Sequence, residues 1–172
     1  MATLSTAGWV VHDHGLAAAF GGNIFAKAAL DPALKEALPQ TEDRSRVLRR
    51  TWRRMGIVMA LSHLAFAVPW LIGRRLRSGR ELGGRARGMV IAKDVLVGVA
   101  VASGVARGAL GQAIMRRSDT EESQGKMRLI RAADVIGTVN LAAVAGAFGL
   151  TAVLAMCSGT SALWSVTSRS LP

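Results

Sequence analysis

Two long apolar stretches, residues 55–73 and 135–156, stand out in the pattern of apolar and polar positions along the chain. With 19 and 22 residues, each reaches the length of about 20 residues that a helix needs to cross a hydrocarbon core of about 30 Å. His63 is the only ionisable residue in either stretch. Because lipid cannot satisfy backbone hydrogen bonds, only helices and closed barrels cross it. The pattern therefore predicts two transmembrane helices.

Two shorter apolar stretches, residues 15–26 and 95–106, contain only 12 residues each. A helix of that length rises about 18 Å, which is too short for the membrane, so both helices must draw neighbouring ionisable residues into the bilayer. The predicted fold is all-α, with residues 1–172 forming one integral membrane domain. This domain is an antiparallel bundle of four transmembrane helices, near residues 9–30, 55–73, 89–108 and 135–156.

Basic residues gather in the segments between these helices. The Asp31-Pro32 step is predicted to stop the first helix, since a proline disfavours the helical conformation of the residue before it. The connections are predicted to be solvated and to lie at the level of the lipid headgroups, and residues 157–172, rich in Ser and Thr, are predicted to fray. Candidates for headgroup contact in the second connection are Arg74, Arg75 and Arg77.

The net charge of +11 would indicate a nucleic-acid partner for a soluble protein, but here membrane orientation and anionic lipid headgroups account for it. No nucleic-acid partner is predicted. Connections one and three hold twelve Lys and Arg residues, whereas connection two and the C-terminal tail hold seven. Because basic loops stay on the cytoplasmic side, this count predicts that both termini lie outside the plasma membrane.

Motifs for catalysis and metal binding are absent from the sequence. It lacks G-x-x-x-x-G-K-[ST], H-E-x-x-H, G-x-S-x-G and C-x-x-C, and its one cysteine, Cys157, can form no internal disulfide. With no soluble domain to host a substrate site, the chain is predicted not to be an enzyme.

Five ionisable residues lie near the starts of the first and third helices: His12, Asp13, His14, Lys93 and Asp94. If both helices start at the outer surface, these residues lie at similar depth and can meet. An ionisable residue in a membrane helix is costly unless it is paired, reaches the surface or faces a wet cavity. Two interpretations follow, namely a structural ion pair between Asp13 and Lys93, or a metal, proton or ligand site.

His63 lies about 12 Å from the inner end of its helix, too deep for an imidazole to reach the surface, so it needs an internal partner. Met55, Met59 and His63 recur at i, i+4 and i+8 and share one helix face. Thioether and imidazole ligands suit Cu(I), and paired imidazoles suit haem iron. The alternative is packing, with methionine as an apolar filler and histidine bonded to a hydroxyl or a carbonyl.

Asn23 and Asn140 lie at similar depth near the inner ends of the first and fourth helices, so a hydrogen bond between them is expected. Lys27 and Arg107 lie still closer to that end and are expected to extend toward the surface. Small residues that permit close approach of helices, within the bundle or in a dimer, are Gly104, Gly108, Gly146 and Gly149.

The stretch from His12 to Leu34 contains, in order, a histidine, an apolar run, the pair Gly21-Gly22, Lys27 and a Pro-Ala step at Pro32. In this it resembles the opening helix of four-helix membrane domains related to the copper-resistance D proteins. The similarity extends loosely to later helices through Lys93, Arg131, Gly137 and Asn140. It implies a four-helix domain in a bacterial inner membrane, with His12 as the residue matching the family motif, and copper handling in the namesake branch. The arginine-rich second connection departs from the family pattern, and the larger domain of copper-transporting members is absent.

Three functions are compatible with these residues. The leading one is a structural or assembly subunit without catalysis, which meets anionic lipid headgroups and a membrane protein partner or a second copy of the chain. The second is a copper- or haem-binding module that uses the helix-one histidines His12 and His14 with His63 and Met59. The third is a small ion or proton transporter with Lys93 and Asp94 as a relay.

Overall fold

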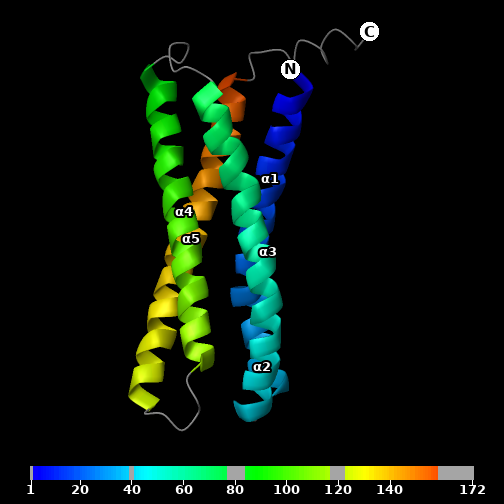
Figure 1. The fold of residues 1–172 in the computed structure, drawn as a ribbon, viewed down its shortest axis with the longest axis vertical. Helices are drawn as coiled ribbons and strands as arrows, with labels where there is room; N and C mark the ends of the chain where they lie inside the picture. Colours follow the sequence, from blue (N-terminus) through cyan, green and yellow to red (C-terminus); the bar gives the residue numbers. More distant parts are fainter. Residues whose placement is uncertain (1, 39–40, 77–83, 117–122, 159–172) are drawn as a thin grey trace.

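The computed structural model describes residues 2–38, 41–76, 84–116 and 123–158, and all of these except Leu38 are helical. In chain order the elements are α1 (Ala2–Phe25), a π-helical turn (Ala26–Leu30), α2 (Asp31–Ala37), α3 (Thr41–Leu76), α4 (Gly84–Arg116) and α5 (Ser123–Ser158). Figure 1 shows the long helices side by side, with consecutive long helices running in opposite directions. The predicted all-α class is confirmed for the described residues.

Three of the helices are long and apolar enough to cross a membrane, at Arg49–Gly73, Arg87–Ile114 and Gln124–Leu154. They lie in α3, α4 and α5, contain the second and third helices predicted from sequence and the fourth up to residue 154, and make the chain compatible with a membrane protein. Helix α1 is not among them, because polar residues such as His12, Asp13 and Asn23 lower its mean hydropathy.

Two helical hairpins make up the bundle. Helices α1 and α3 pack extensively against each other, as do α4 and α5, while narrower contacts join α1 to α5 and α3 to α4. The first hairpin is tightest at Gly15, where an added Cβ would lie 2.6 Å from the backbone N of Phe66. Leu16, Phe66, Val97 and Val144 contribute to the buried apolar core, which draws on all four long helices.

The helices extend well beyond the apolar stretches at one end of the bundle, the lower end in Figure 1. Helix α3 begins at Thr41, 14 residues before the predicted start at residue 55, and α5 begins at Ser123, 12 residues before residue 135. Arginine is a good helix former, and a helix that satisfies its own backbone can continue out of the bilayer. The basic segments expected as connections are thus helical over most of their described length.

The predicted helix stop at Asp31-Pro32 is wrong. Leu30 and Asp31 both have helical backbone angles, and the helix continues to Ala37. A π turn precedes the proline, with the Asp31 N–H bonded to the Ala26 carbonyl. Pro32 then falls in the first turn of α2, where the N–H that it lacks is not needed.

The four glycines considered for close helix approach divide into two pairs. An added Cβ at Gly104 would meet His63, and one at Gly146 would meet Leu96, so these two face other helices of the bundle. Gly108 and Gly149 have nothing within 4 Å of the corresponding position. Only the first pair therefore serves packing between the helices described here.

Candidate functional site

A buried lysine lies in the half of the bundle where α1 and α4 begin. Lys93 of α4 is only 1% exposed, and its Nζ lies 2.9 Å from His12 Nε2 of α1. His12 Nδ1 lies 2.5 Å from the Phe66 carbonyl oxygen of α3. Because a carbonyl only accepts, His12 carries its proton on Nδ1, and its Nε2 accepts a hydrogen bond from Lys93. One neutral imidazole thus connects α1 to both α3 and α4.

Aromatic rings complete the surroundings of this lysine. Lys93 Nζ lies 3.9 Å from the centroid of the Trp70 ring and 5.6 Å from that of Trp9. The His12 ring stacks on Trp70, whose Nε1 donates a 2.8 Å hydrogen bond to Asp94 Oδ1. Ring faces attract a cation, so an ammonium group is stabilised here without direct ion pairing. We call this group the cation cage: Trp9, His12, Trp70, Lys93 and Asp94.

The cation cage differs from the predicted outer cluster in its pairing. Lys93 contacts His12, and Asp13 is exposed and forms no ion pair within 4.0 Å among the described residues. His14 is also exposed and bonds to the Val10 carbonyl of its own helix. Consecutive helical residues point about 100° apart, so only His12 of these three faces the interior. The predicted ion pair between Asp13 and Lys93 is wrong.

A second polar group crosses the middle of the bundle and touches each long helix in turn. Arg107 of α4 donates to Asn23 Oδ1 of α1 at 2.7 Å, and Asn23 Nδ2 donates to Asn140 Oδ1 of α5 at 3.0 Å. Asn140 Nδ2 lies 3.1 Å from His63 Nε2 of α3, and His63 Nδ1 lies 2.6 Å from the Met59 carbonyl oxygen. The expected bond between the asparagines is present. We call Arg107, Asn23, Asn140 and His63 the amide chain.

The amide chain has a direction. It begins at a guanidinium, which only donates, and ends at a carbonyl, which only accepts, so His63 carries its proton on Nδ1 and accepts at Nε2. Asn140 Nδ2 also lies 2.6 Å from the Ala100 carbonyl oxygen and 3.0 Å from Ser103 Oγ, both on α4. Asn140 is therefore the residue of the chain bonded to the other three long helices.

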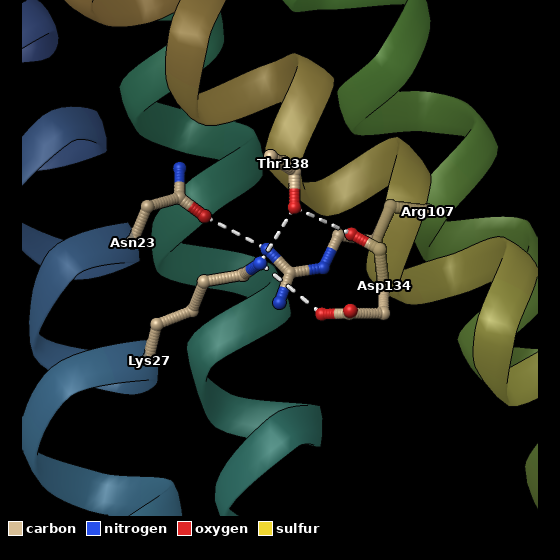
Figure 2. Close-up of polar contacts among 5 residues, drawn as sticks. All are labelled: Asn23, Lys27, Arg107, Asp134 and Thr138. Atoms are coloured by element: carbon tan, nitrogen blue, oxygen red, sulfur yellow. Dashed lines mark hydrogen bonds and ion pairs between the residues drawn. The ribbon is translucent and has the colours of Figure 1, made fainter.

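Charged residues surround the Arg107 end of the amide chain, as Figure 2 shows. Lys27 Nζ donates to Thr138 Oγ1 at 2.7 Å and lies 3.1 Å from Asp134 Oδ1. The Arg107 guanidinium lies 4.8 Å from the Trp52 ring centroid. Lys27 extends toward the surface as expected, since its partner Asp134 is 72% exposed, whereas Arg107 instead bonds to the buried Asn23.

A partly buried carboxyl lies beside this inner cluster. Burial raises the pKa of Asp31 above its ordinary value, and the positive charges of Lys35 and Arg107 act against that rise. Asp31 belongs to α2, beyond the apolar part of the bundle.

Several site residues were not foreseen in the sequence. Trp9, Trp70 and Trp52 supply ring faces for the two cations, and Ser103 and Asp134 supply acceptors. Trp9 and Trp70 lie near the outer ends of their apolar stretches, and this position is the one signal that could have indicated them. The positions of these residues in the sequence do not predict which cation each ring contacts, because ring and cation lie on different helices.

The two buried histidines among the candidate metal and haem ligands are engaged in other bonds. Both ring nitrogens of His12 and of His63 are engaged, and the Met59 sulfur lies 3.2 Å from the position of an added Cβ at Gly22, so it packs on α1. No group of three or more His, Cys, Asp or Glu residues suited to a metal occurs in the described part of the chain. Binding a metal or haem iron at either buried histidine would first break one of these bonds.

Two of the three arginines predicted to meet headgroups lie at the end of α3. Arg74 and Arg75 belong to its last turn, and Arg77 lies outside the described residues, as do residues 159–172 of the predicted tail.

A scan against protein-family models and searches of curated proteins and of solved structures find no match to this chain. The relationship to the copper-resistance D proteins stays a prediction. Support for a function comes from the geometry of the cation cage and the amide chain.

Proposed function

We propose that this chain is a multi-pass protein of the bacterial inner membrane, with four transmembrane helices and both termini outside, and that it acts as a structural or assembly subunit without catalysis. One observation carries the proposal: the polar side chains that face the interior bond to one another and to backbone carbonyls across all four long helices. Groups engaged in this way stabilise a bundle and are not free to bind a substrate.

The surroundings of α1 support a fourth crossing. Its buried polar residues, His12 and Asn23, bond to neighbouring helices, whereas Val10, Val11, Ile24 and Phe25 are exposed. Polar residues in membrane helices face the protein interior in this manner, and apolar ones face lipid. Mean hydropathy combines both faces of the helix, so it does not show that one face of α1 is polar and the other apolar.

Reporter fusions test the number of crossings. Alkaline phosphatase, which is active only outside the inner membrane, is fused after residue 158 and within residues 77–83 and 117–122. We expect activity at the first two positions and none at the third. With three crossings, the N-terminus and residue 158 lie on opposite sides, so an epitope on the N-terminus that is inaccessible from outside would contradict the proposal.

Native mass spectrometry of the full chain in mild detergent tests the assembly role. We expect a stoichiometric complex with a membrane protein partner or with further copies of the chain. Recovery of the protein only as a monomer from gently solubilised membranes would overturn the assembly role.

An absorption spectrum and a metal analysis of the same sample test the copper or haem alternative, including the resemblance of the first helix. We expect a colourless protein free of copper. A Soret band or bound copper that is lost in His63→Ala and retained in His14→Ala would overturn the proposal, since His63 is buried and His14 is exposed.

A further inference from the structure

Five arginines on the basic extension of α3 share one face of the helix. At about 100° per residue they fall within an arc of about 140°, and all five are exposed. We call these residues the arginine stripe: Arg46, Arg49, Arg50, Arg53 and Arg54. Since they are exposed, the stripe points away from the bundle.

The arginine stripe is crowded with like charge. Its members lie three or four residues apart along the helix, where like charges repel and weaken a helix. Asp43 lies 4.0 Å from Arg46, at the limit of ion-pair range, and Arg46 has a further interaction partner. A helix with this pattern is stabilised by external anions.

The same face continues upward as an apolar surface. Counting around the helix from Arg46, the arc that holds the stripe also holds six exposed apolar residues further along α3, namely Ile57, Leu61, Leu64, Val68, Leu71 and Ile72. One continuous helix face therefore presents hydrocarbon-compatible side chains and then guanidinium groups. In a membrane-spanning helix, this is the order of acyl chains and phosphates in the adjacent lipid.

The part of the arginine stripe next to the apolar stretch matches the depth of a headgroup layer. Arg46 to Arg54 rise about 12 Å along the helix, and Arg54 directly precedes the apolar stretch at residue 55. The polar region on each side of a bilayer is about 5–8 Å deep. Arg50, Arg53 and Arg54 lie within about 8 Å of residue 55 and fall inside this layer, whereas Arg46 and Arg49 extend beyond it. A binding site for a soluble acidic protein or a nucleic acid would instead have its basic residues further from the apolar surface.

We infer that the arginine stripe is a binding surface for the phosphates of anionic phospholipids, and that it selects such lipids around α3. Guanidinium groups bind phosphate oxygens in a bidentate manner, and juxtamembrane basic residues attract anionic leaflets. The inference rests on the proposed membrane insertion of α3.

The test measures lipid selectivity of the full chain. The protein is reconstituted in nanodiscs with equimolar phosphatidylglycerol and phosphatidylcholine, extracted into mild detergent, and analysed for retained lipid by native mass spectrometry. We expect enrichment of phosphatidylglycerol, with each stripe arginine contributing about fivefold to its binding constant. The variant Arg50→Gln/Arg53→Gln/Arg54→Gln should lose most of this enrichment.

A matched variant, Lys35→Gln/Arg116→Gln/Arg128→Gln, removes the same charge from exposed residues on other helices at the same end of the bundle. It should keep the enrichment. Equal loss in both variants, or no preference for phosphatidylglycerol in the unmodified chain, would overturn the inference. So would displacement of the lipid by an equal concentration of inorganic phosphate, or loss of an acidic protein from the stripe variant with unchanged lipid selectivity.

Alkaline carbonate extraction separates this inference from the proposed function. A chain that is released from membranes contradicts membrane insertion itself. A chain that stays in the membrane and shows no lipid preference contradicts only the role of the stripe.

Discussion

The cation cage and the amide chain hold polar groups inside one bundle in different ways. In the cation cage, Lys93 brings a buried amine that depends on a neutral imidazole and two indole faces. In the amide chain, neutral groups pass hydrogen bonds across four helices, and its one charged member, Arg107, lies at the inner end beside Trp52. The comparison teaches that the stability of a single buried charge depends on its few direct partners. In the amide chain, the stabilising hydrogen bonds are instead distributed over four helices.

The largest effect is expected at Gly15, where the backbones of α1 and α3 approach closely. Gly15→Ala places a methyl group 2.6 Å from the Phe66 N and 2.8 Å from the Ser62 O, so α1 and α3 must separate and disturb the cation cage. We expect a loss of about 3 kcal/mol in the free energy of unfolding, measured by titration with sodium dodecyl sulfate in mixed micelles. Gly21→Ala, with nothing within 4 Å, is the control and should be neutral or stabilising by up to about 1 kcal/mol. Equal effects would show that the backbone contact is unimportant.

The second largest loss of stability is expected when Asn140, the residue of the amide chain bonded to three other helices, is removed. Asn140→Ala deletes bonds to three helices, and at about 0.6–1 kcal/mol for each interhelical bond the loss should be about 2 kcal/mol. The same micelle titration measures it. Thr151→Ala on the same helix removes only a bond to the Ala147 carbonyl and should cost less than about 0.5 kcal/mol. If Asn140→Ala behaved like Thr151→Ala, the chain would not hold the hairpins together.

In the cation cage, removing the partner of Lys93 should destabilise the protein more than removing the charge of Lys93 itself. His12→Ala leaves the Lys93 ammonium without its imidazole acceptor and should cost about 2 kcal/mol. Lys93→Met keeps the apolar stem and removes the charge, so it should change stability by less than about 1 kcal/mol in either direction. Thermal unfolding of both variants and of the double variant measures this. A larger loss in Lys93→Met than in His12→Ala would contradict the description of a dependent buried charge.

A smaller effect is expected from crowding His63 in the amide chain. In Gly104→Ala the new methyl group would lie 2.9 Å from His63 Nε2, so the ring must shift away from Asn140, at a cost of about 1 kcal/mol. Gly108→Ala, one turn later and with nothing within 4 Å, is its control. Nuclear magnetic resonance of the His63 ring should show a changed environment in the first variant only.

The smallest effect is a pH dependence at the inner end. Because burial raises the pKa of Asp31, the folded chain holds this proton more tightly than the unfolded chain. This contribution to stability is complete below the unfolded pKa of about 4 and is lost as the pH rises through the higher folded pKa. Asp31→Asn should abolish that dependence, with a change of only a few tenths of a kcal/mol because the group is partly solvated. Stability measured against pH that is identical in both proteins would contradict it.

Some of the site was predictable because it depends on depth alone. Asn23 and Asn140 lie equally far along antiparallel helices, so their hydrogen bond could be expected before any packing was known. The pairing of Lys93 could not, since His12 and Asp13 are at nearly the same depth and differ by about 100° around the helix. Rotation of α1 decides between them, and that rotation depends on the close contact of Gly15 with α3.

By itself, the sequence determined the helical class, the three most apolar helices and the polar residues that need partners, because hydropathy and helix period are local properties of the chain. Only the tertiary structure decided which partner each polar group found, that Pro32 continues a helix, and that the basic segments are helical extensions of the bundle. These outcomes depend on the rotation, height and contact of helices distant in sequence, which no local pattern encodes.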